Sequence, residues 1–263
     1  MVDLAGSSWV VTGAAGNIGA ALRLALHERG VRLISTDLRY AQPVGSNDEV
    51  IIADIANLEP LVGLFDGADG VIHLGGLSDE ADFRDLAEVN IVGTYHVLEA
   101  ARRAAVPRVI YASSNRSTGM YPVTETVTTD MPPRPDGFYG VSKVAGEALC
   151  QLYTDKFGLS TIAIRIGSYE QRPNSAREQR TWLSPSDAVR AFIAAMTTDH
   201  DSAVFYAVSA NENLWWDLGS GEAIGYYPED DSASLGPTEP IDADAPQGGP
   251  YASAKYSLER MRD

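Results

Sequence analysis

The sequence predicts an α/β fold: a doubly wound parallel sheet with helices on both faces and a small C-terminal substrate-binding portion. Short, continuously apolar runs alternate with amphipathic helical stretches, which is typical of parallel strands buried on both faces. A glycine-rich turn joins the first apolar run to the first helical stretch. Both observations indicate a Rossmann-type arrangement.

Each element is assigned from its own stretch of sequence. The apolar run before the glycine turn is the first strand. The helix after the turn carries apolar residues on one side, among them Leu22 and Leu26. Further strands are expected at 31–38, 49–55, 70–76, 108–114, 159–168 and 203–209, and helices at 83–106, 139–157 and 181–199.

Composition argues against several classes of function. The formal net charge is −16, and a polyanionic surface repels nucleic acids and anionic membranes. Cys150 is the only cysteine and is expected to be a buried thiol, so no disulfide or cysteine metal cluster is predicted. The four histidines lack metal-ligand spacing, and no metal is expected. Because no signal sequence and no apolar run of about 18 residues is found, a cytoplasmic protein is expected.

The turn "TGAAGNIG" predicts a dinucleotide site. Gly13, Gly16 and Gly19 recur at three-residue spacing, with Asn17 and Ile18 between the last two. Such glycines allow a tight turn and bring the backbone close to a pyrophosphate at the positive end of the helix. A turn that only packs helix on strand is the alternative, but the strand before and the helix after favour a dinucleotide.

Acidic residues after the next two strands bear on the nucleotide. Asp37 closes the second strand about twenty residues beyond the glycines, where a carboxylate binds the ribose hydroxyls and repels a 2′-phosphate. NAD is therefore favoured over NADP, although the nearby Arg39 could weaken the discrimination. Asp54 and Ile55 follow the third strand, where Asp54 could reach the adenine amino group or only cap the next helix. Neither role is favoured.

The pentapeptide "YGVSK" places Tyr139 and Lys143 one helical turn apart, on the same helix face. A neighbouring cation stabilises a tyrosine phenolate and makes it a better general base. Alone, such a pair is usually surface helix. After a glycine turn and a serine-rich strand end, it indicates catalysis.

These motifs stand in the order and spacing of the extended short-chain dehydrogenase/reductase superfamily, which the whole chain resembles. Closer runs, among them "HLGGLS", "RPDGFYGVSK", "RIGS" and "SANENLWWD", are similar to the uronate dehydrogenases. The resemblance implies an NAD enzyme that oxidises C1 of hexuronates to lactones. It also implies a homo-oligomer, with the C-terminal tail at subunit contacts through Tyr251 and Tyr256. Residues 1–168 would form the NAD-binding core with the catalytic groups, and 169–263 the interleaved substrate-binding portion and tail.

The resemblance also implies roles for individual residues. Ser114 would hydrogen-bond the reacting hydroxyl, Tyr139 would remove its proton, and Lys143 would lower the tyrosine pKa and hold the nicotinamide ribose. Asn90 would support a proton-relay water, with a helix-packing amide as the alternative. Arg177 would clamp an anionic group, because guanidinium binds oxyanions through two parallel hydrogen bonds. The cofactor site would also include Leu74, Gly75 and Gly76, and the substrate site Ser78, Asn115 and Ser168.

One position departs from the relatives, which carry histidine where this chain has Arg116. A second full cation beside Arg177 would suit an anion bulkier than a carboxylate. Three interpretations stay open: Arg116 binds an acidic group at C6 of the sugar, pairs with Glu125 or another acid, or replaces histidine without consequence. Arg172 and Arg180 lie in a polar loop near the clamp, where arginines are usually solvated.

The sequence therefore predicts an NAD-dependent dehydrogenase that acts on a small anionic sugar. It would oxidise C1 of an aldohexopyranose with an acidic C6 group to the lactone, with the 6-sulfo-hexose sulfoquinovose favoured because of Arg116. The alternatives are a hexuronate (glucuronate or galacturonate), glucose 6-phosphate and, less favoured, a sugar-nucleotide epimerase reaction. A cofactor-sensing regulatory protein is the non-enzymatic alternative, although such proteins often lose the tyrosine or the lysine.

Overall fold

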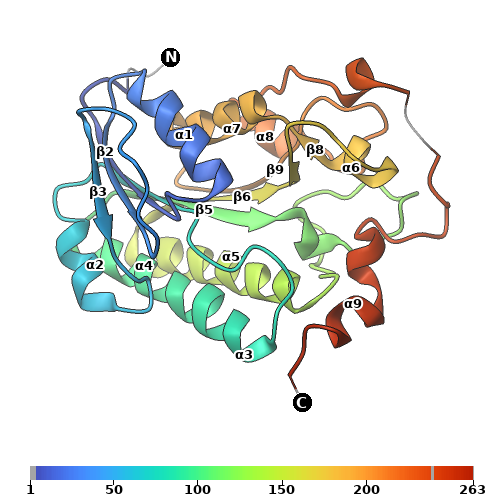
Figure 1. The fold of residues 1–263 in the computed structure, drawn as a ribbon, viewed down its shortest axis with the longest axis horizontal. Coiled ribbons are helices and arrows are strands. Elements are labelled where there is room, and N and C mark those ends of the chain that lie inside the picture. The colour runs from blue at the N-terminus through green and yellow to red at the C-terminus, as the bar shows by residue number, and fades with distance from the viewer. Residues whose placement is uncertain (1–3, 238–239, 263) are drawn as a thin grey trace.

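The computed structural model describes residues 4–237 and 240–262 and has a parallel sheet between two helical layers (Figure 1). The strand order is β3-β2-β1-β4-β5-β6-β9, so the direction of winding reverses between β1 and β4. The predicted doubly wound sheet is confirmed. Its strands are β1 (Ser8–Thr12), β2 (Arg32–Asp37), β3 (Asp48–Ile52), β4 (Gly70–His73), β5 (Arg108–Ser114), β6 (Ser160–Ile166) and β9 (Ser202–Ala207).

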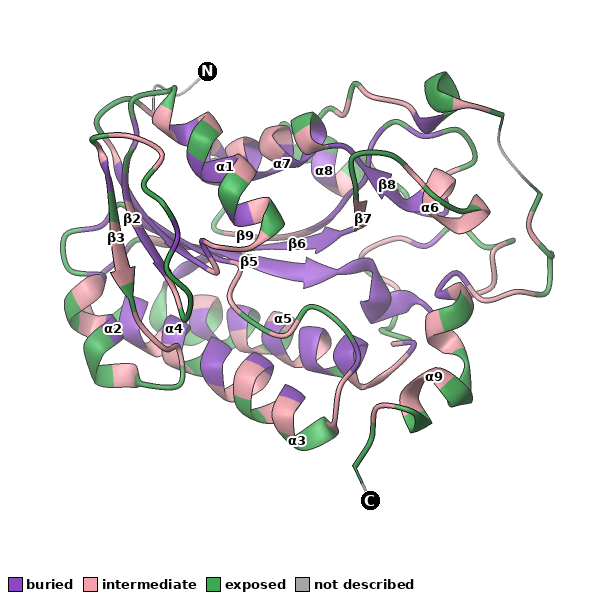
Figure 2. Cartoon of the chain, in the orientation of Figure 1, coloured by how far each residue is buried: buried purple, intermediate pink, exposed green. Residues whose placement is uncertain are grey.

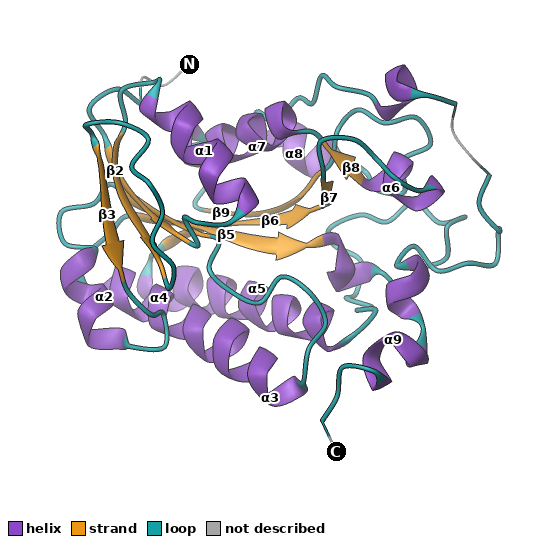
Figure 3. Ribbon diagram, in the orientation of Figure 1, coloured by secondary structure: helices purple, strands orange, loops and turns teal. Residues whose placement is uncertain are grey.

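Helices cover both faces of the sheet (Figure 3). One face carries α1 (Asn17–His27), α7 (Pro185–Thr197) and α8 (Gly219–Ala223), and the other carries α2 (Leu58–Leu64), α4 (Gly93–Arg103) and α5 (Phe138–Phe157). The helix predicted over 83–106 is interrupted. A short α3 (Phe83–Leu86) leads into a π-helical stretch, Ala87–Val92, before α4 begins. Such stretches often mark functional sites.

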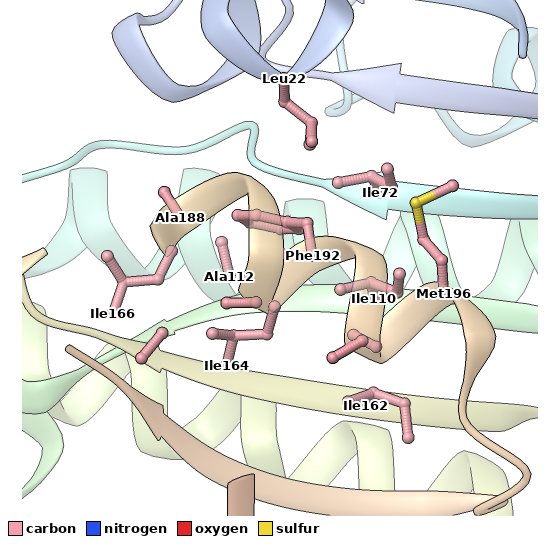
Figure 4. Close-up of a cluster of buried hydrophobic side chains, with 14 of the residues drawn as sticks. Leu22, Ile72, Ile110, Ala112, Ile162, Ile164, Ile166, Ala188, Phe192 and Met196 are labelled. Atoms are coloured by element: carbon pink, nitrogen blue, oxygen red, sulfur yellow. The ribbon is translucent and has the colours of Figure 1, made fainter. Parts of the chain in front are cut away.

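Two apolar cores fill the space between the sheet and its helical layers. Figure 4 shows the core beneath α7, where Leu22, Phe192 and Met196 meet isoleucines of the central strands. The core on the opposite face of the sheet includes Leu61 and Cys150. The predicted burial of the Cys150 thiol is confirmed. Buried residues follow β5 and β6 along their length (Figure 2). Within the described ranges, no helix is long and apolar enough to cross a membrane.

The segment after β6 first forms a small two-stranded sheet and then adds the last strand of the main sheet. It forms β7 (Ser168–Tyr169), α6 (Ala176–Thr181) and β8 (Trp182–Leu183), and it adds β9 to the main sheet. The helix predicted from residue 181 therefore begins only at Pro185, because Trp182 and Leu183 pair with β7.

The tail docks on the loop that follows β5. The N–H groups of Gln247 and Gly248 donate to the carbonyls of Tyr121 (2.8 Å) and Gly119 (2.7 Å). A short 3-10 turn, Gly249–Ala252, and α9 (Ala254–Leu258) complete the part of the tail that the structure describes. This docking brings the tail next to the carboxyl end of β5.

Candidate active site

A cavity of about 930 Å³ opens along the carboxyl ends of the parallel strands, at the point where the strand order reverses. Open α/β sheets bind ligands at this point. One end of the cavity is lined by the glycine turn and the end of β2, and the other by the end of β5, the start of α5 and Arg177. Most of the predicted site residues therefore share one cavity.

The glycine turn has the geometry of a pyrophosphate cradle. Gly13 has φ +71°, and a Cβ there would lie 2.7 Å from the backbone of Leu74 and Gly75. A Cβ on Gly19 would lie 2.5 Å from the carbonyl oxygen of Gly13. The N-cap of α1 is Gly16, which supplies no side-chain cap, so a bound phosphate can take that place.

The end of β2 fits the ribose of NAD. Asp37 lines the cavity, and its carboxylate accepts from the N–H groups of Ala15 (3.1 Å) and Arg39 (3.0 Å). The guanidinium of Arg39 lies 3.8 Å from the carboxylate, but its side chain is exposed, so it neutralises Asp37 only weakly. Asp37 therefore lies where the sequence predicts it, and its discrimination against a 2′-phosphate stays a prediction.

Asp54 and Ile55 also line the cavity. The N-cap of α2 is Asn57, and Asp54 instead accepts from the N–H of Ala56 (2.9 Å) within the preceding turn. Asp54 is therefore not the N-cap of α2, and that interpretation is wrong. Its contact with the adenine stays a prediction. Leu74, Gly75 and Gly76 form the adjoining wall of the cavity, and their contact with the cofactor stays a prediction.

Asn90 holds a loop instead of lining the cavity. It lies in the π-helical stretch, where its amide donates to the carbonyl of Leu77 (3.0 Å) and to the hydroxyl of Ser142 (3.0 Å). Its side-chain oxygen accepts from the N–H of Leu77 (2.8 Å). These contacts match the packing alternative, whereas the predicted cofactor and proton-relay roles stay predictions.

The predicted catalytic residues meet where β5 ends and α5 begins. Ser114 is the last residue of β5, and Tyr139 is the second residue of α5. Lys143 follows one turn later and donates from Nζ to the carbonyl of Ala112 (2.9 Å). All three side chains are buried and line the cavity.

Burial opposes the charged forms of both titrating groups. It raises the pKa of Tyr139 to about 12, against the lowering effects of the Arg116 charge and of a hydrogen bond with Ser114. It lowers the pKa of Lys143 to about 8. The predicted influence of Lys143 on the tyrosine stays a prediction, and Arg116 is a second cation near the ring, 5.0 Å from its centroid.

The end of the cavity beside β5, α5 and α6, called the sugar end below after the substrate that the sequence predicts, contains a cation without a carboxylate partner among the described residues. Arg177, in α6, donates from Nε to the carbonyl of Gln247 (2.7 Å) and from Nη1 to the hydroxyl of Ser168 (3.4 Å). Among the residues that the structure describes, no carboxylate lies within ion-pair distance of it. The buried Nδ2 of Asn115 also has no hydrogen-bond partner in the described chain. Ser78 completes this end of the cavity.

Arg116 has the opposite environment. Its Nε, Nη1 and Nη2 lie 2.9, 2.7 and 3.3 Å from carboxylate oxygens of Asp136, Asp79 and Glu80, and its side chain is 7% exposed. The prediction that Arg116 offers a second free cation to the substrate is therefore wrong. The alternative of pairing with an acid is confirmed, but with three acids other than Glu125.

Three residues around the site were missed by sequence reasoning. Glu80 and Asp136 hold Arg116, and Tyr251 lines the cavity with its ring 4.5 Å from the guanidinium carbon of Arg116 and 5.1 Å from that of Arg177. Glu80 directly follows "HLGGLSD", and Asp136 precedes "GFYGVSK", so their nearness to the motifs was the available signal.

Comparison with known proteins agrees with this geometry. The sequence profile of the NAD dependent epimerase/dehydratase family matches residues 9–170. The uronate dehydrogenase of Pseudomonas syringae pv. tomato is 40% identical over 225 residues, covering 85% of this chain and 82% of the relative. The L-arabinose 1-dehydrogenase (NAD(P)+) of Haloferax volcanii is 35% identical, covering 86% of this chain and 97% of the relative.

A solved structure of a uronate dehydrogenase variant from Agrobacterium tumefaciens, complexed with NAD, superimposes with a TM-score of 0.87 at 38% identity. The match covers 94% of this chain and 97% of that one. The predicted NAD cofactor and NAD-dependent oxidoreductase activity are confirmed. The chain belongs to the NAD-dependent epimerase/dehydratase family.

Proposed function

We propose that the protein oxidises C1 of a hexuronate such as glucuronate or galacturonate to the lactone. The observation that carries this proposal is Arg177, whose partly buried guanidinium lines the cavity and has no carboxylate partner among the described residues. A partly buried cation that has only neutral partners is costly, and a ligand carboxylate would supply the missing counter-ion. Ser168 and the free amide of Asn115 add neutral donors beside it.

The reaction follows from the residues at the other side of the sugar end. Tyr139 would accept the proton of the C1 hydroxyl, and Ser114 would hold that hydroxyl by a hydrogen bond. Tyr139 must be a phenolate to accept this proton, and Lys143 would keep a positive charge nearby that favours the phenolate over the neutral phenol. When bound, NAD supplies the hydride acceptor for C1 chemistry. Loss of the hydride and the proton converts the ring C1 carbon to the carbonyl carbon of a lactone.

A sulfonated sugar is less well supported than a uronate. The preference for sulfoquinovose depended on Arg116 as a second cation for the substrate. Three carboxylates surround that guanidinium, so the cluster carries no excess positive charge. One free arginine matches one carboxylate, and similarity to uronate dehydrogenases supports the same substrate class.

The test compares initial rates of NADH formation with glucuronate, galacturonate, sulfoquinovose, glucose 6-phosphate, glucose and L-arabinose. Uronates are expected to lead for the wild type. Arg177→Gln should raise KM for uronates by roughly 100-fold, because it removes a charge-assisted bidentate contact, with a small effect on neutral sugars. Arg172→Gln is the matched control, since it removes the same charge from an exposed side chain a few residues earlier.

Other outcomes would identify the alternatives. A lead for sulfoquinovose that is lost in Arg116→His would overturn the uronate proposal in favour of the sulfosugar. A lead for glucose or L-arabinose over the uronates in the wild type, unchanged in Arg177→Gln, would indicate a neutral-sugar dehydrogenase. Tightly retained NAD without NADH release would indicate epimerase chemistry.

We also propose a homo-oligomer in the cytoplasm whose ligand is a small anionic sugar. The rings of Tyr251 and Tyr256 pack against each other and against Arg116 of their own chain, so a subunit contact there would use their outer surfaces. Light scattering after size-exclusion chromatography measures the subunit number directly.

A further inference from the structure

The helix that carries Tyr139 and Lys143 has no cap of its own. The N-cap of α5 is Gly137, which makes no side-chain hydrogen bond, and the first turn contains no acidic residue. A helix of 20 residues leaves its first N–H groups without helical partners, and these groups need acceptors when they are buried. The acceptors must therefore come from elsewhere in the chain.

Glu80 supplies them from the segment that follows β4. Its Oε1 accepts from the N–H of Phe138 (2.9 Å), and its Oε2 accepts from the N–H of Tyr139 (3.0 Å). The carboxylate thus binds the first two residues of α5, one of which is the proposed proton acceptor. A Cβ on Gly137 would lie 2.5 Å from Oε2, so only glycine leaves this approach open.

Arg116 offsets the energetic cost of burying the Glu80 carboxylate. The side chain of Glu80 is 0% exposed, and Nη2 of Arg116 lies 3.3 Å from its Oε2. The N–H of Asp136 donates to the carbonyl of Arg116 (3.2 Å), while Nε of Arg116 donates to the carboxylate of Asp136 (2.9 Å). Ser257, in α9, donates from its hydroxyl to Oε1 of Glu80 (2.8 Å). The cap is therefore tied both to the end of β5 and to the tail.

We propose that Glu80 is a positioning residue for the oxidation: it caps the catalytic helix from a distant segment, and Arg116 holds it there. This inference rests on the proposed function, in which Tyr139 takes the proton. It also gives Arg116 a role that needs no substrate contact. Misplacing a reacting group by about 1 Å can cost 100-fold in rate, so the start of α5 must be held firmly.

The central experiment is Glu80→Gln, which turns one acceptor oxygen into an NH₂ group that cannot accept from the helix. We expect kcat to fall by roughly 10- to 100-fold on the best sugar of the panel. KM for the sugar and Kd for NAD should change by less than about threefold, because neither binding site loses a contact. A merely structural role would lower stability without this split between kcat and KM.

Asp79→Asn is the matched control. It makes the same chemical change one residue earlier and also touches Arg116 (2.7 Å), but Asp79 makes no hydrogen bond to the first turn of α5 among the described contacts. Its kcat should stay within about twofold of wild type. Equal losses in Asp79→Asn and Glu80→Gln would overturn the inference, since charge balance around Arg116 would then explain both.

Gly137→Ala provides an independent variant should Glu80→Gln fail to fold. The added methyl would displace the carboxylate, so it should reproduce the selective loss of kcat, and combining it with Glu80→Gln should add little. An unchanged kcat in Gly137→Ala would contradict the inference.

Tyr139→Phe distinguishes failure of the positioning role of Glu80 from failure of the proposed function. Loss of turnover with NAD binding intact, together with a full rate in Glu80→Gln, would overturn only the positioning role. Retained turnover in Tyr139→Phe would overturn the proposed function and the inference with it.

Discussion

The two ends of the cavity are built in different ways. The NAD end is made mostly of backbone and of the carboxylates of Asp37 and Asp54, and its glycines lie within seven residues of one another. The sugar end is assembled from the ends of β4, β5 and β6, from α6 and from the tail. A local motif can therefore specify the first, whereas the second depends on which side chains the fold brings together.

Two arginines at the sugar end show the consequence. Arg177 has only neutral partners among the described residues, whereas Arg116 is surrounded by three carboxylates. Both have the same side chain and both line the cavity. Because its partners are neutral, Arg177 keeps a charge that an anionic ligand could neutralise. The charge of Arg116 is already neutralised by carboxylates of its own chain, so its role is structural.

The largest expected effect is at the NAD end. Gly13→Ala should weaken NAD binding by roughly 100-fold and lower the free energy of unfolding by about 2–3 kcal/mol, because φ is +71° and the methyl would meet the backbone of Leu74 and Gly75. Calorimetric titration and urea unfolding measure both. Gly63→Ala is the control: its methyl meets open space in α2, so stability should rise by about 0.5–1 kcal/mol with unchanged NAD affinity. Unchanged affinity in Gly13→Ala would contradict the cradle.

A second prediction concerns Lys143 and pH. Its folded pKa, about 8, lies below the ordinary value of 10.5, so between these values the unfolded chain binds a proton that the folded chain has lost. Stability contributed by this group therefore rises with pH in that window, and the burial cost is complete below it. Lys143→Met should unfold with a free energy about 2 kcal/mol higher than wild type at neutral pH, and this gain should shrink toward pH 10.

Urea unfolding at neutral pH and at about pH 10 measures this change, with Lys156→Met as the control because that lysine is exposed. A gain in Lys143→Met that does not depend on pH would show that packing, and not charge burial, sets the difference.

The smallest expected effect concerns the choice of cofactor. Asp37→Asn should lower the ratio of kcat/KM for NAD over NADP by roughly tenfold, because the charge that repels a 2′-phosphate is removed. Asp54→Asn also removes a carboxylate from the cavity wall, but it should leave the ratio unchanged. If this ratio is the same in Asp37→Asn and in wild type, the Asp37 charge does not select NAD over NADP. The backbone around Ala15 and Arg39 would then be responsible for the selection.

Local patterns were sufficient for the sheet, the glycine turn, Asp37 and the Tyr139–Lys143 pair. Each depends on residues close in sequence, where strand burial, helix periodicity or a glycine φ leaves few alternatives. Local patterns failed where distant segments meet. They missed the π-helical stretch around Asn90 and the pairing of Trp182 and Leu183 with β7. The partners of Arg116 lie 20, 36 and 37 residues away, so no nearby pattern reports them.

The sequence by itself determined the doubly wound sheet and the NAD end of the cavity, because both follow from the order of apolar runs and from glycine conformation. Only the tertiary structure decided which arginine is free for an anion and which residue caps the catalytic helix. The physical reason is that a buried charge is defined by its neighbours. Glu80 reaches α5 across 58 residues of chain, and only the folded molecule brings the two together.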